Sequence, residues 1–221
     1  MKRINVAIDG PSAAGKSTIS KQIAKRMGYV HLDTGAMYRS TAYKALQKGI
    51  SWNDEDRLAE MLASTNIQLT ADGKVILDGV DVSYEIRQNE ISKGASDVSR
   101  HEKVRKELVK RQQQMALDKG FVMDGRDIGT VVLTDAELKI YQTASASKRA
   151  LRRHKENIEK GIESDLEAIE AAIIERDYQD MNREVSPLRK ADDAIELDTS
   201  DLTIDEVVDK VMEMILNIVN E

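Results

Sequence analysis

The sequence of 221 residues contains no cysteine and no long apolar run. Without cysteine there is no disulfide, no thiolate zinc site and no cysteine nucleophile, which fits a reducing compartment. No stretch approaches the roughly 20 apolar residues of a membrane-spanning helix, and the apolar run before Asp9 is too short for a signal peptide. We therefore expect a soluble, cytoplasmic protein with no membrane partner.

Aromatic residues and net positive charge are also scarce. Aromatics make up 4% of the chain and the formal net charge is -6. Binding to a nucleic-acid backbone needs clustered, uncompensated Lys and Arg, and single strands also need aromatic side chains for stacking. Nucleic acid is therefore not expected as a partner, whereas small anionic ligands remain open.

What the chain does contain is an alternation of short apolar runs and helical patterns. These runs lie at residues 2–9, 29–32, 121–123, 138–141 and 194–197. Such an alternation is typical of an α/β fold in which helices cover both faces of a parallel sheet. The length suits a single domain, residues 1–221, with room for small insertions.

Two stretches depart from this alternation. The pairs Asp72-Gly73 and Asp78-Gly79 are hairpin-turn signals within 67–83, so we expect a small antiparallel insert. From about residue 147 to 190 the chain is rich in charges of both signs at helical spacing, for which a solvated helical pair is the simplest interpretation. Near the C-terminus, Thr203 and Glu206 predict a capping box that begins an amphipathic helix.

Residues 10–17, GPSAAGKS, match the complete P-loop pattern between a strand and a helix. The glycines let backbone N–H groups and the helix N-terminus face a phosphate, Lys16 reaches the β- and γ-phosphate oxygens, and the Ser17 hydroxyl is suited to Mg²⁺. We therefore predict ATP with Mg²⁺ as the donor. The residues expected to bind it are Gly10, Pro11, Ser12, Ala13, Ala14, Gly15, Lys16, Ser17 and Thr18.

The P-loop alone does not distinguish a switch GTPase, a motor ATPase and a kinase. The chain has no Asn-Lys-x-Asp motif to read guanine, and a motor would normally be longer. Arginines lie near small polar or acidic residues in several separate segments, and a second phosphate-bearing substrate would need them. These arginines are Arg39, Arg105, Arg126, Arg176 and Arg183.

Three further motifs follow the P-loop in order, and together they resemble the bacterial cytidylate kinases. They are DTGAMYR at 33–39, DGRDIGT at 124–130 and the segment 176–183. The resemblance covers essentially the whole chain and is more specific than the P-loop. It implies a P-loop core, an insert at about 62–95 that binds the nucleoside monophosphate, and a mobile lid at about 147–190, which we call the lid segment.

The resemblance also implies the reaction and its residues. The γ-phosphoryl group of ATP would pass to CMP or dCMP, and a monomer is expected. The acceptor would be bound by Thr34, Arg39, Ser96, Arg105, Arg126, Asp127, Arg176, Asp180 and Arg183, and the catalytic residues would be Lys16, Arg126, Arg176 and Arg183.

The chemistry of cytosine agrees with two of these assignments. Cytosine offers an N4 amino donor beside the N3 and O2 acceptors, so the carboxylate of Asp127 next to the guanidinium of Arg105 matches it. Uracil reverses two of these groups and would leave buried polar atoms unpaired. Ser96 is a weaker candidate, because a helix-capping hydroxyl would look the same.

Other residues keep two interpretations. Asp124 is either a carboxylate near Mg²⁺ or a residue that holds the turn together. Spacing at i, i+4 and i+7 predicts that Arg176, Asp180 and Arg183 share one helical face, either as a salt-bridge stripe or as part of a lid. Arg149, Arg152 and Arg153 either cover ATP or form a solvated face.

No role in metal binding or catalysis is assigned to His31, His101 or His154, which lack ligand spacing. Two other functions remain open: a small P-loop kinase for UMP or a non-nucleotide acceptor, and an ATP sensor without catalytic activity. A sensor would have no need for two separate arginine clusters.

Overall fold

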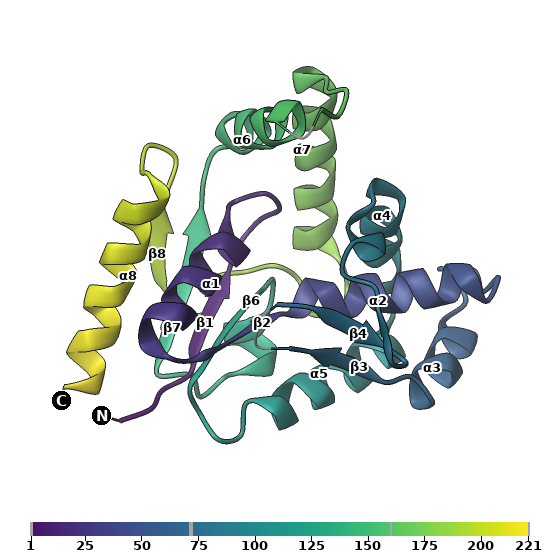
Figure 1. Cartoon of the computed structure of the whole chain (residues 1–221), viewed down its shortest axis with the longest axis horizontal. Helices are drawn as coiled ribbons and strands as arrows, with labels where there is room; N and C mark the ends of the chain where they lie inside the picture. The colour runs from purple at the N-terminus through teal and green to yellow at the C-terminus, as the bar shows by residue number, and fades with distance from the viewer. Residues whose placement is uncertain (1, 71–72, 160, 221) are drawn as a thin grey trace.

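A five-stranded parallel sheet forms the centre of the computed structural model, which describes residues 2–70, 73–159 and 161–220 (Figure 1). All four strand pairings are parallel. In spatial order the strands are β2 (Val30–Asp33), β6 (Phe121–Gly125), β1 (Val6–Asp9), β7 (Leu138–Thr143) and β8 (Ile195–Asp198). The predicted α/β fold is therefore confirmed.

Both faces of the sheet are buried. Val6 and Ile8 of β1 pack with α1 (Lys16–Met27) and α8 (Ile204–Val219). Ala7 points the other way, toward η2 (Ile128–Val132) and residues that follow α5 (Glu102–Met115). Burial on both sides explains why β1 is a continuous apolar run rather than an alternating one.

The segment after β2 builds a second core. It contains α2 (Thr34–Gln47), α3 (Glu55–Ala63), η1 (Glu85–Arg87) and α4 (Asn89–Val98), whose apolar side chains form one cluster with Val104 and Leu108 of α5. Trp52 is packed against this cluster and donates its indole N–H to the carbonyl of Ala42 over 3.0 Å. The cluster holds α2 and α4 side by side.

The expected antiparallel insert is present as three short strands. These are β3 (Ile67–Leu69), β4 (Val75–Leu77) and β5 (Val80–Asp81). Asp78 and Gly79 between β4 and β5 have φ values of 50° and 87°, as a two-residue hairpin turn requires. Asp72, which belongs to the other predicted turn, lies outside the described residues.

Two helices occupy the lid segment and stand above the sheet in Figure 1. They are α6 (Ala146–Glu159) and α7 (Leu166–Asn182). The prediction that Arg183 continues the helical face of Arg176 and Asp180 is wrong. Arg183 follows the last helical residue with extended backbone angles, φ -64° and ψ 144°, because the chain turns back there and the Leu188 N–H bonds to the Asp180 carbonyl.

The C-terminal helix α8 begins with the predicted capping box. Thr203 accepts from the Glu206 N–H, and the Glu206 carboxylate accepts from the Thr203 N–H. Its apolar face packs on α1 and the sheet. None of the helices in the described parts of the chain combines the length and the apolar composition needed to cross a membrane.

We predict that Gly94→Val lowers the free energy of unfolding by about 1–3 kcal/mol, the usual cost of overpacking. A β-carbon at Gly94 would lie 2.5 Å from the Trp52 ring, so α4 would have to move away from Trp52. Urea unfolding followed by Trp52 fluorescence measures the change. Lys93→Val, at an exposed position on the same helix, is the control and should change stability by less than about 0.5 kcal/mol. Equal effects of the two substitutions would contradict the packing argument.

Candidate active site

The P-loop runs from the end of β1 into α1. Its entry requires glycine, because a β-carbon at Gly10 would lie 2.0 Å from the backbone oxygen of Gln142 on β7. Gly15 precedes the helix in the left-handed conformation, φ 88°, and Ala13 has φ 59°. These backbone angles curl the loop so that the N-terminus of α1 opens toward a cavity.

In this structure Lys16 is turned into its own loop. Its Nζ donates to the carbonyls of Gly10 and Pro11, both over 2.7 Å. Burial, together with the positive charge of Arg126, lowers the pKa of Lys16 to about 7. Both hydrogen-bond partners of Lys16 Nζ are neutral carbonyls. A phosphate group in the loop would give Lys16 a negatively charged partner.

Ser17, Asp124 and His31 meet beside the loop. The Ser17 hydroxyl donates to Asp124 Oδ2 over 2.6 Å, and His31 Nε2 lies 2.5 Å from Asp124 Oδ1. A hydroxyl and a carboxylate are the oxygen donors that Mg²⁺ uses together with phosphates and water. The pair therefore fits Mg²⁺ held jointly with a nucleotide. Within the described residues no group of three or more His, Cys, Asp or Glu is arranged to hold a metal by itself.

Asp33 fixes Arg39 at the start of α2. The Asp33 carboxylate accepts from the Ala36 N–H over 3.1 Å, which caps the helix, and from Arg39 Nη2 over 2.6 Å. Although burial opposes ionisation, the charge of Arg39 lowers the pKa of Asp33. Thr34 donates its hydroxyl to the Asp124 carbonyl over 2.8 Å, which joins α2 to the end of β6.

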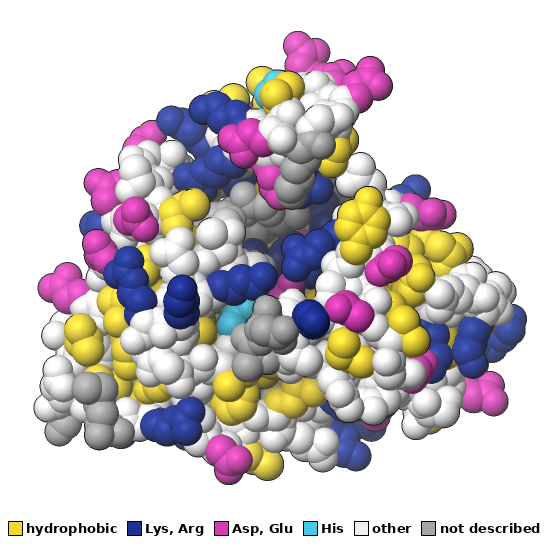
Figure 2. Space-filling view, in the orientation of Figure 1, with side chains coloured by type: hydrophobic (Ala, Val, Ile, Leu, Met, Phe, Trp, Pro, Cys, Tyr) yellow, Lys and Arg dark blue, Asp and Glu magenta, His cyan; other side chains and the backbone are white. Residues whose placement is uncertain are grey.

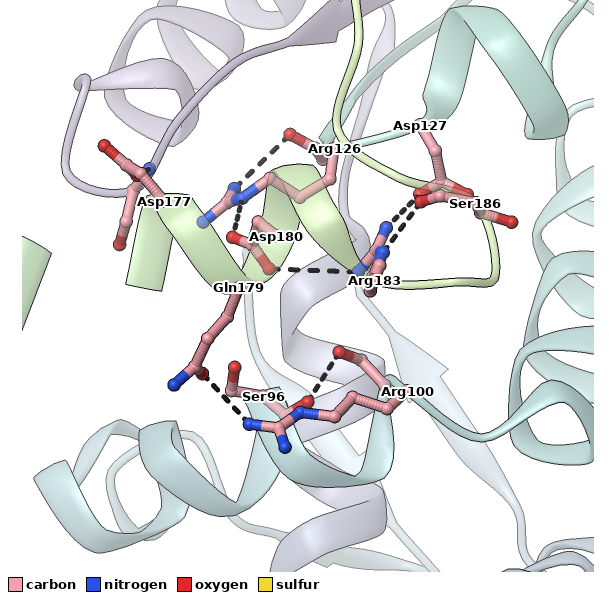
Figure 3. Close-up of polar contacts among 12 residues, drawn as sticks. Ser96, Arg100, Arg126, Asp127, Asp177, Gln179, Asp180, Arg183 and Ser186 are labelled. Carbon is pink, nitrogen blue, oxygen red and sulfur yellow. Dashed lines mark hydrogen bonds and ion pairs between the residues drawn. The ribbon is translucent and has the colours of Figure 1, made fainter. Parts of the chain in front are cut away.

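On the far side of the cavity two carboxylates, Asp127 and Asp180, lie among four arginines, of which Figure 3 shows Arg126 and Arg183. Asp180 accepts from Arg126 Nε over 2.8 Å and lies 3.9 Å from Arg183 Nη1. Asp127 forms an ion pair with Arg105 and lies 3.7 Å from Arg183 Nη2. Arg176, the fourth, contributes to the charge around Asp180: burial opposes ionisation there, but Arg126 and Arg176 lower the pKa of that carboxyl.

Three of these arginines, and also Arg39, retain a buried nitrogen atom without a hydrogen-bond partner in the described structure. The atoms are Arg39 Nε, Arg105 Nε, Arg176 Nε and Arg183 Nη2. Burial, then the charges of Arg126 and Arg39, lower the pKa of Arg176 to about 10. Unpaired buried donors are costly, so this arrangement is suited to an anion that would accept from them.

These groups line one cavity of about 790 Å³. Figure 2 shows the hollow between the lid segment and the rest of the molecule, with Lys and Arg side chains along its walls. Of the expected residues, the lining includes Ser12, Ala13, Ala14, Gly15, Lys16, Ser17, Thr18, Thr34, Arg39, Arg105, Arg126, Asp127, Arg176, Asp180 and Arg183. The P-loop and the arginine cluster therefore face the same space.

Some expected residues lie elsewhere. Gly10, Pro11 and Ser96 are not among the lining residues, whereas Ala95 and Ser99, which flank Ser96 on and after α4, are. Gly10 and Pro11 instead offer their carbonyls to Lys16. Of the three arginines left undecided, Arg153 lines the cavity, while Arg149 and Arg152 donate to backbone carbonyls of the P-loop.

Sequence reasoning missed several supporting residues. The buried Asp9 carboxylate accepts from the Ile128 and Gly129 N–H groups, each over 2.7 Å. Burial raises the pKa of Asp9 to about 7, although these two hydrogen bonds act to lower it. Tyr38 lies under Arg105, with its ring centroid 5.4 Å from the guanidinium carbon. The position of Asp9, directly before the P-loop, was the only local signal of its role.

Comparisons with known proteins agree with the motifs. The family model described as cytidylate kinase matches residues 6–217. The chain is 51% identical to the cytidylate kinase of Bacillus subtilis (strain 168) over 217 residues, 97% of each protein. It is 52% identical to the cytidylate kinase of Caldicellulosiruptor saccharolyticus over 222 residues, 99% of this chain and 98% of the relative.

Among solved structures, an uncharacterized protein from Eubacterium ventriosum ATCC 27560 matches with a TM-score of 0.54 and 13% identity. The match covers 98% of this chain and 99% of that one, and it bears on the fold alone. The full-length matches to curated relatives bear on the family. They confirm the resemblance inferred from the motifs, and the chain belongs to the cytidylate kinase family.

Proposed function

We propose that this protein transfers the γ-phosphoryl group of ATP to CMP or dCMP, which gives ADP and CDP or dCDP. The observation that carries the proposal is a single cavity with two anion-binding ends. One end is the P-loop. The other is the arginine cluster, whose buried nitrogen atoms include several with no hydrogen-bond partner among the described residues. A transfer between two phosphate-bearing substrates needs both ends to face one space.

At the donor end, residues 10–18 would hold the phosphates of ATP. Lys16 would leave the Gly10 and Pro11 carbonyls and contact the β- and γ-phosphates, and this exchange replaces two neutral acceptors with charged ones. Ser17 and Asp124 would hold Mg²⁺, which neutralises phosphate charge when it is bound. His31 would hold the Asp124 carboxylate from the other side.

At the acceptor end, Asp127 and Arg105 would read the base. Their ion pair is buried, with side-chain exposures of 7% and 3%, so a base that leaves either group unpaired is disfavoured. Arg39, Arg126 and Thr34 would hold the phosphate, and Asp180 a sugar hydroxyl. Ser96 would contact the base only if α4 moves, because Ala95 and Ser99 line the cavity in its place.

Catalysis would consist of positioning and charge stabilisation. The acceptor phosphate oxygen is already anionic, so no protein nucleophile is required. Lys16, Arg126, Arg176 and Arg183 would stabilise the transferring group as charge moves to the leaving oxygen. The lid segment, 147–190, would close over the substrates and exclude water, and the insert, about 62–95, would adjust around the monophosphate.

The setting of the reaction is part of the same proposal. CDP and dCDP are intermediates of pyrimidine nucleotide metabolism, and the absence of cysteine from the chain fits the cytoplasm. A monomer is proposed because both anion-binding ends of the cavity come from one chain.

The test of the function is ADP release in a coupled assay with ATP and a panel of monophosphates. CMP and dCMP should be turned over, UMP much more slowly, and no acceptor should give only background ATP hydrolysis. Preferred turnover of UMP would identify a different small P-loop kinase. ATP binding without turnover of any acceptor would favour a sensor.

We predict that Lys16→Ala abolishes phosphoryl transfer while the circular dichroism spectrum stays unchanged. Among the described residues, the Lys16 ammonium group donates its hydrogen bonds to carbonyls of the loop, so its loss would remove a phosphate contact rather than core packing. Lys21→Ala, which removes another lysine on the cavity wall, is the control and should retain most of the activity. Near-normal turnover by Lys16→Ala would remove the P-loop lysine from the mechanism.

The lowered pKa of Lys16 predicts that ATP binding takes up a proton in alkaline solution. With a pKa of about 7, Lys16 is mostly neutral in the free protein at about pH 8.5, and contact with phosphate restores the charge. Uptake should approach one proton per ATP at that pH and vanish near pH 6, where the free lysine is already protonated. Calorimetry in buffers of different ionisation enthalpy measures it.

Lys16→Arg provides the control, since arginine stays protonated throughout this range. It also subtracts any proton bound or released by the nucleotide itself. The same uptake in Lys16→Arg and in the natural protein would show that Lys16 does not titrate.

We predict that Asp127→Ala lowers kcat/KM for CMP by about 10²-fold or more and affects UMP much less, because only cytosine presents an amino donor to this carboxylate. Asp127→Asn keeps the shape of the side chain and replaces one acceptor by a donor, so it should shift preference toward UMP. Initial rates with both monophosphates measure the ratio. An equal loss for CMP and UMP would mean that Asp127 supports the site without reading the base.

A further inference from the structure

Both backbone polar groups of Ser12 in the P-loop are bound by side chains of the lid segment. The Ser12 N–H donates to Asp177 Oδ1 over 3.2 Å, and the Ser12 carbonyl accepts from Arg149 Nη1 over 2.9 Å. Asp177 Oδ2 and Arg149 Nη2 are 2.6 Å apart. The three residues form a closed ring of contacts, which we call the Ser12 clamp.

The Ser12 clamp is largely shielded from solvent and anchored to the sheet. The Arg149 side chain is 6% exposed and the Asp177 side chain 14%. Arg149 Nε also donates to the carbonyl of Ala144, which follows β7, over 2.8 Å. One guanidinium thus connects the end of a central strand, the P-loop and both lid helices, and a buried pair of this kind is strongly disrupted when one partner is removed.

Asp177 lies next to the residues on which the proposed reaction depends. It follows Arg176 directly on α7 and precedes Asp180 by three residues; both of these line the cavity, whereas Asp177 and Arg149 are not among the lining residues. Figure 3 shows Asp177 beside the P-loop, while Asp180 one turn later points to Arg126. Holding Asp177 therefore sets the rotation of α7 about its axis and the height of Arg176 above the P-loop.

We propose that Asp177 and Arg149 are positioning residues for phosphoryl transfer, which hold the P-loop and α7 in one register so that Arg176 reaches the transferring group. The inference rests on the proposed function. Positioning residues of this kind act on the transition state, because a guanidinium displaced by about 1 Å loses most of its catalytic effect while substrates still bind. The expected signature is a lower kcat with KM nearly unchanged.

The test compares steady-state kinetics of Asp177→Asn and Arg149→Lys with those of the natural protein. Asp177→Asn keeps an oxygen for the Ser12 N–H but loses the charge that pairs with Arg149. Arg149→Lys keeps the charge, but a single ammonium group cannot reach Asp177, Ser12 and Ala144 together. Each substitution should lower kcat about tenfold or more, with KM for ATP and for CMP within about threefold.

Glu175→Gln is the matched control. Its carboxylate lies on the exposed side of α7, accepts from Gln179, and has no contact with the P-loop among the described residues. It should leave kcat and both KM values unchanged. A second readout, amide hydrogen exchange of the unliganded proteins, should show faster exchange in residues 10–18 and in α7 together for Asp177→Asn, and in neither for Glu175→Gln.

The outcomes separate this inference from the proposed function. Absence of turnover with CMP by the natural protein would overturn the proposed function. Hydrogen exchange would still test whether the Ser12 clamp holds the P-loop and α7 together. If the natural protein is active and both clamp variants keep its kcat, the positioning role is wrong even if their melting temperatures fall. A rise in KM alone would equally overturn it. Should Asp177→Asn fail to fold, the milder Arg149→Lys decides by the same criteria.

Discussion

The structure depends on a concentration of buried positive charge around one cavity. Arg105, Arg126 and Arg183 share two carboxylates, Asp127 and Asp180. Arg176 on α7 adds its charge to the surroundings of Asp180. Cations buried without a full set of partners are costly, and here the cost is visible in the pKa of Arg176, lowered to about 10, and of Lys16, lowered to about 7. A polyanionic ligand would relieve this excess of positive charge, which is why the proposed function places phosphates in this cavity.

The parallel sheet makes this concentration of charge feasible. Because β1 and β6 are adjacent and parallel, the P-loop after Asp9 and the Arg126–Asp127 turn after Gly125 emerge at the same edge. Asp9 then binds the N–H groups of Ile128 and Gly129, so the two loops are tied to each other beneath the cavity. The P-loop and the Arg126–Asp127 turn are therefore fixed to each other, and the lid segment lies above both of them.

The contacts of the lid segment with the rest of the protein are mainly polar. Arg126 donates to Asp180, and Asp177 and Arg149 bind Ser12. Arg100, two residues after α4, donates to Gln179 over 3.0 Å. The buried residues of α7 are Ile173 and Asp180, so one of them is apolar. Polar contacts of this kind can be exchanged for contacts with phosphate at little net cost, whereas an apolar interface would have to be exposed to water before the lid could move.

Local patterns in the sequence determined the elements and the family. Residues 10–17 formed the predicted loop and helix start, although glycine at position 10 is required by the distant backbone of Gln142. The turn at Asp78-Gly79 and the capping box at Thr203 depend only on residues a few positions apart, and both formed as predicted. The motifs at 33–39 and 124–130 identified the family for the same reason, since they are contiguous. Tertiary structure alone decided which distant groups meet. Ser17 and His31 meet Asp124, Arg126 meets Asp180, and Asp177 meets the Ser12 N–H; these pairs are separated by 107, 93, 54 and 165 residues. These pairs follow from the strand order β2-β6-β1-β7-β8 and from the turn that ends α7 before Arg183, and both are products of long-range packing that no local spacing records.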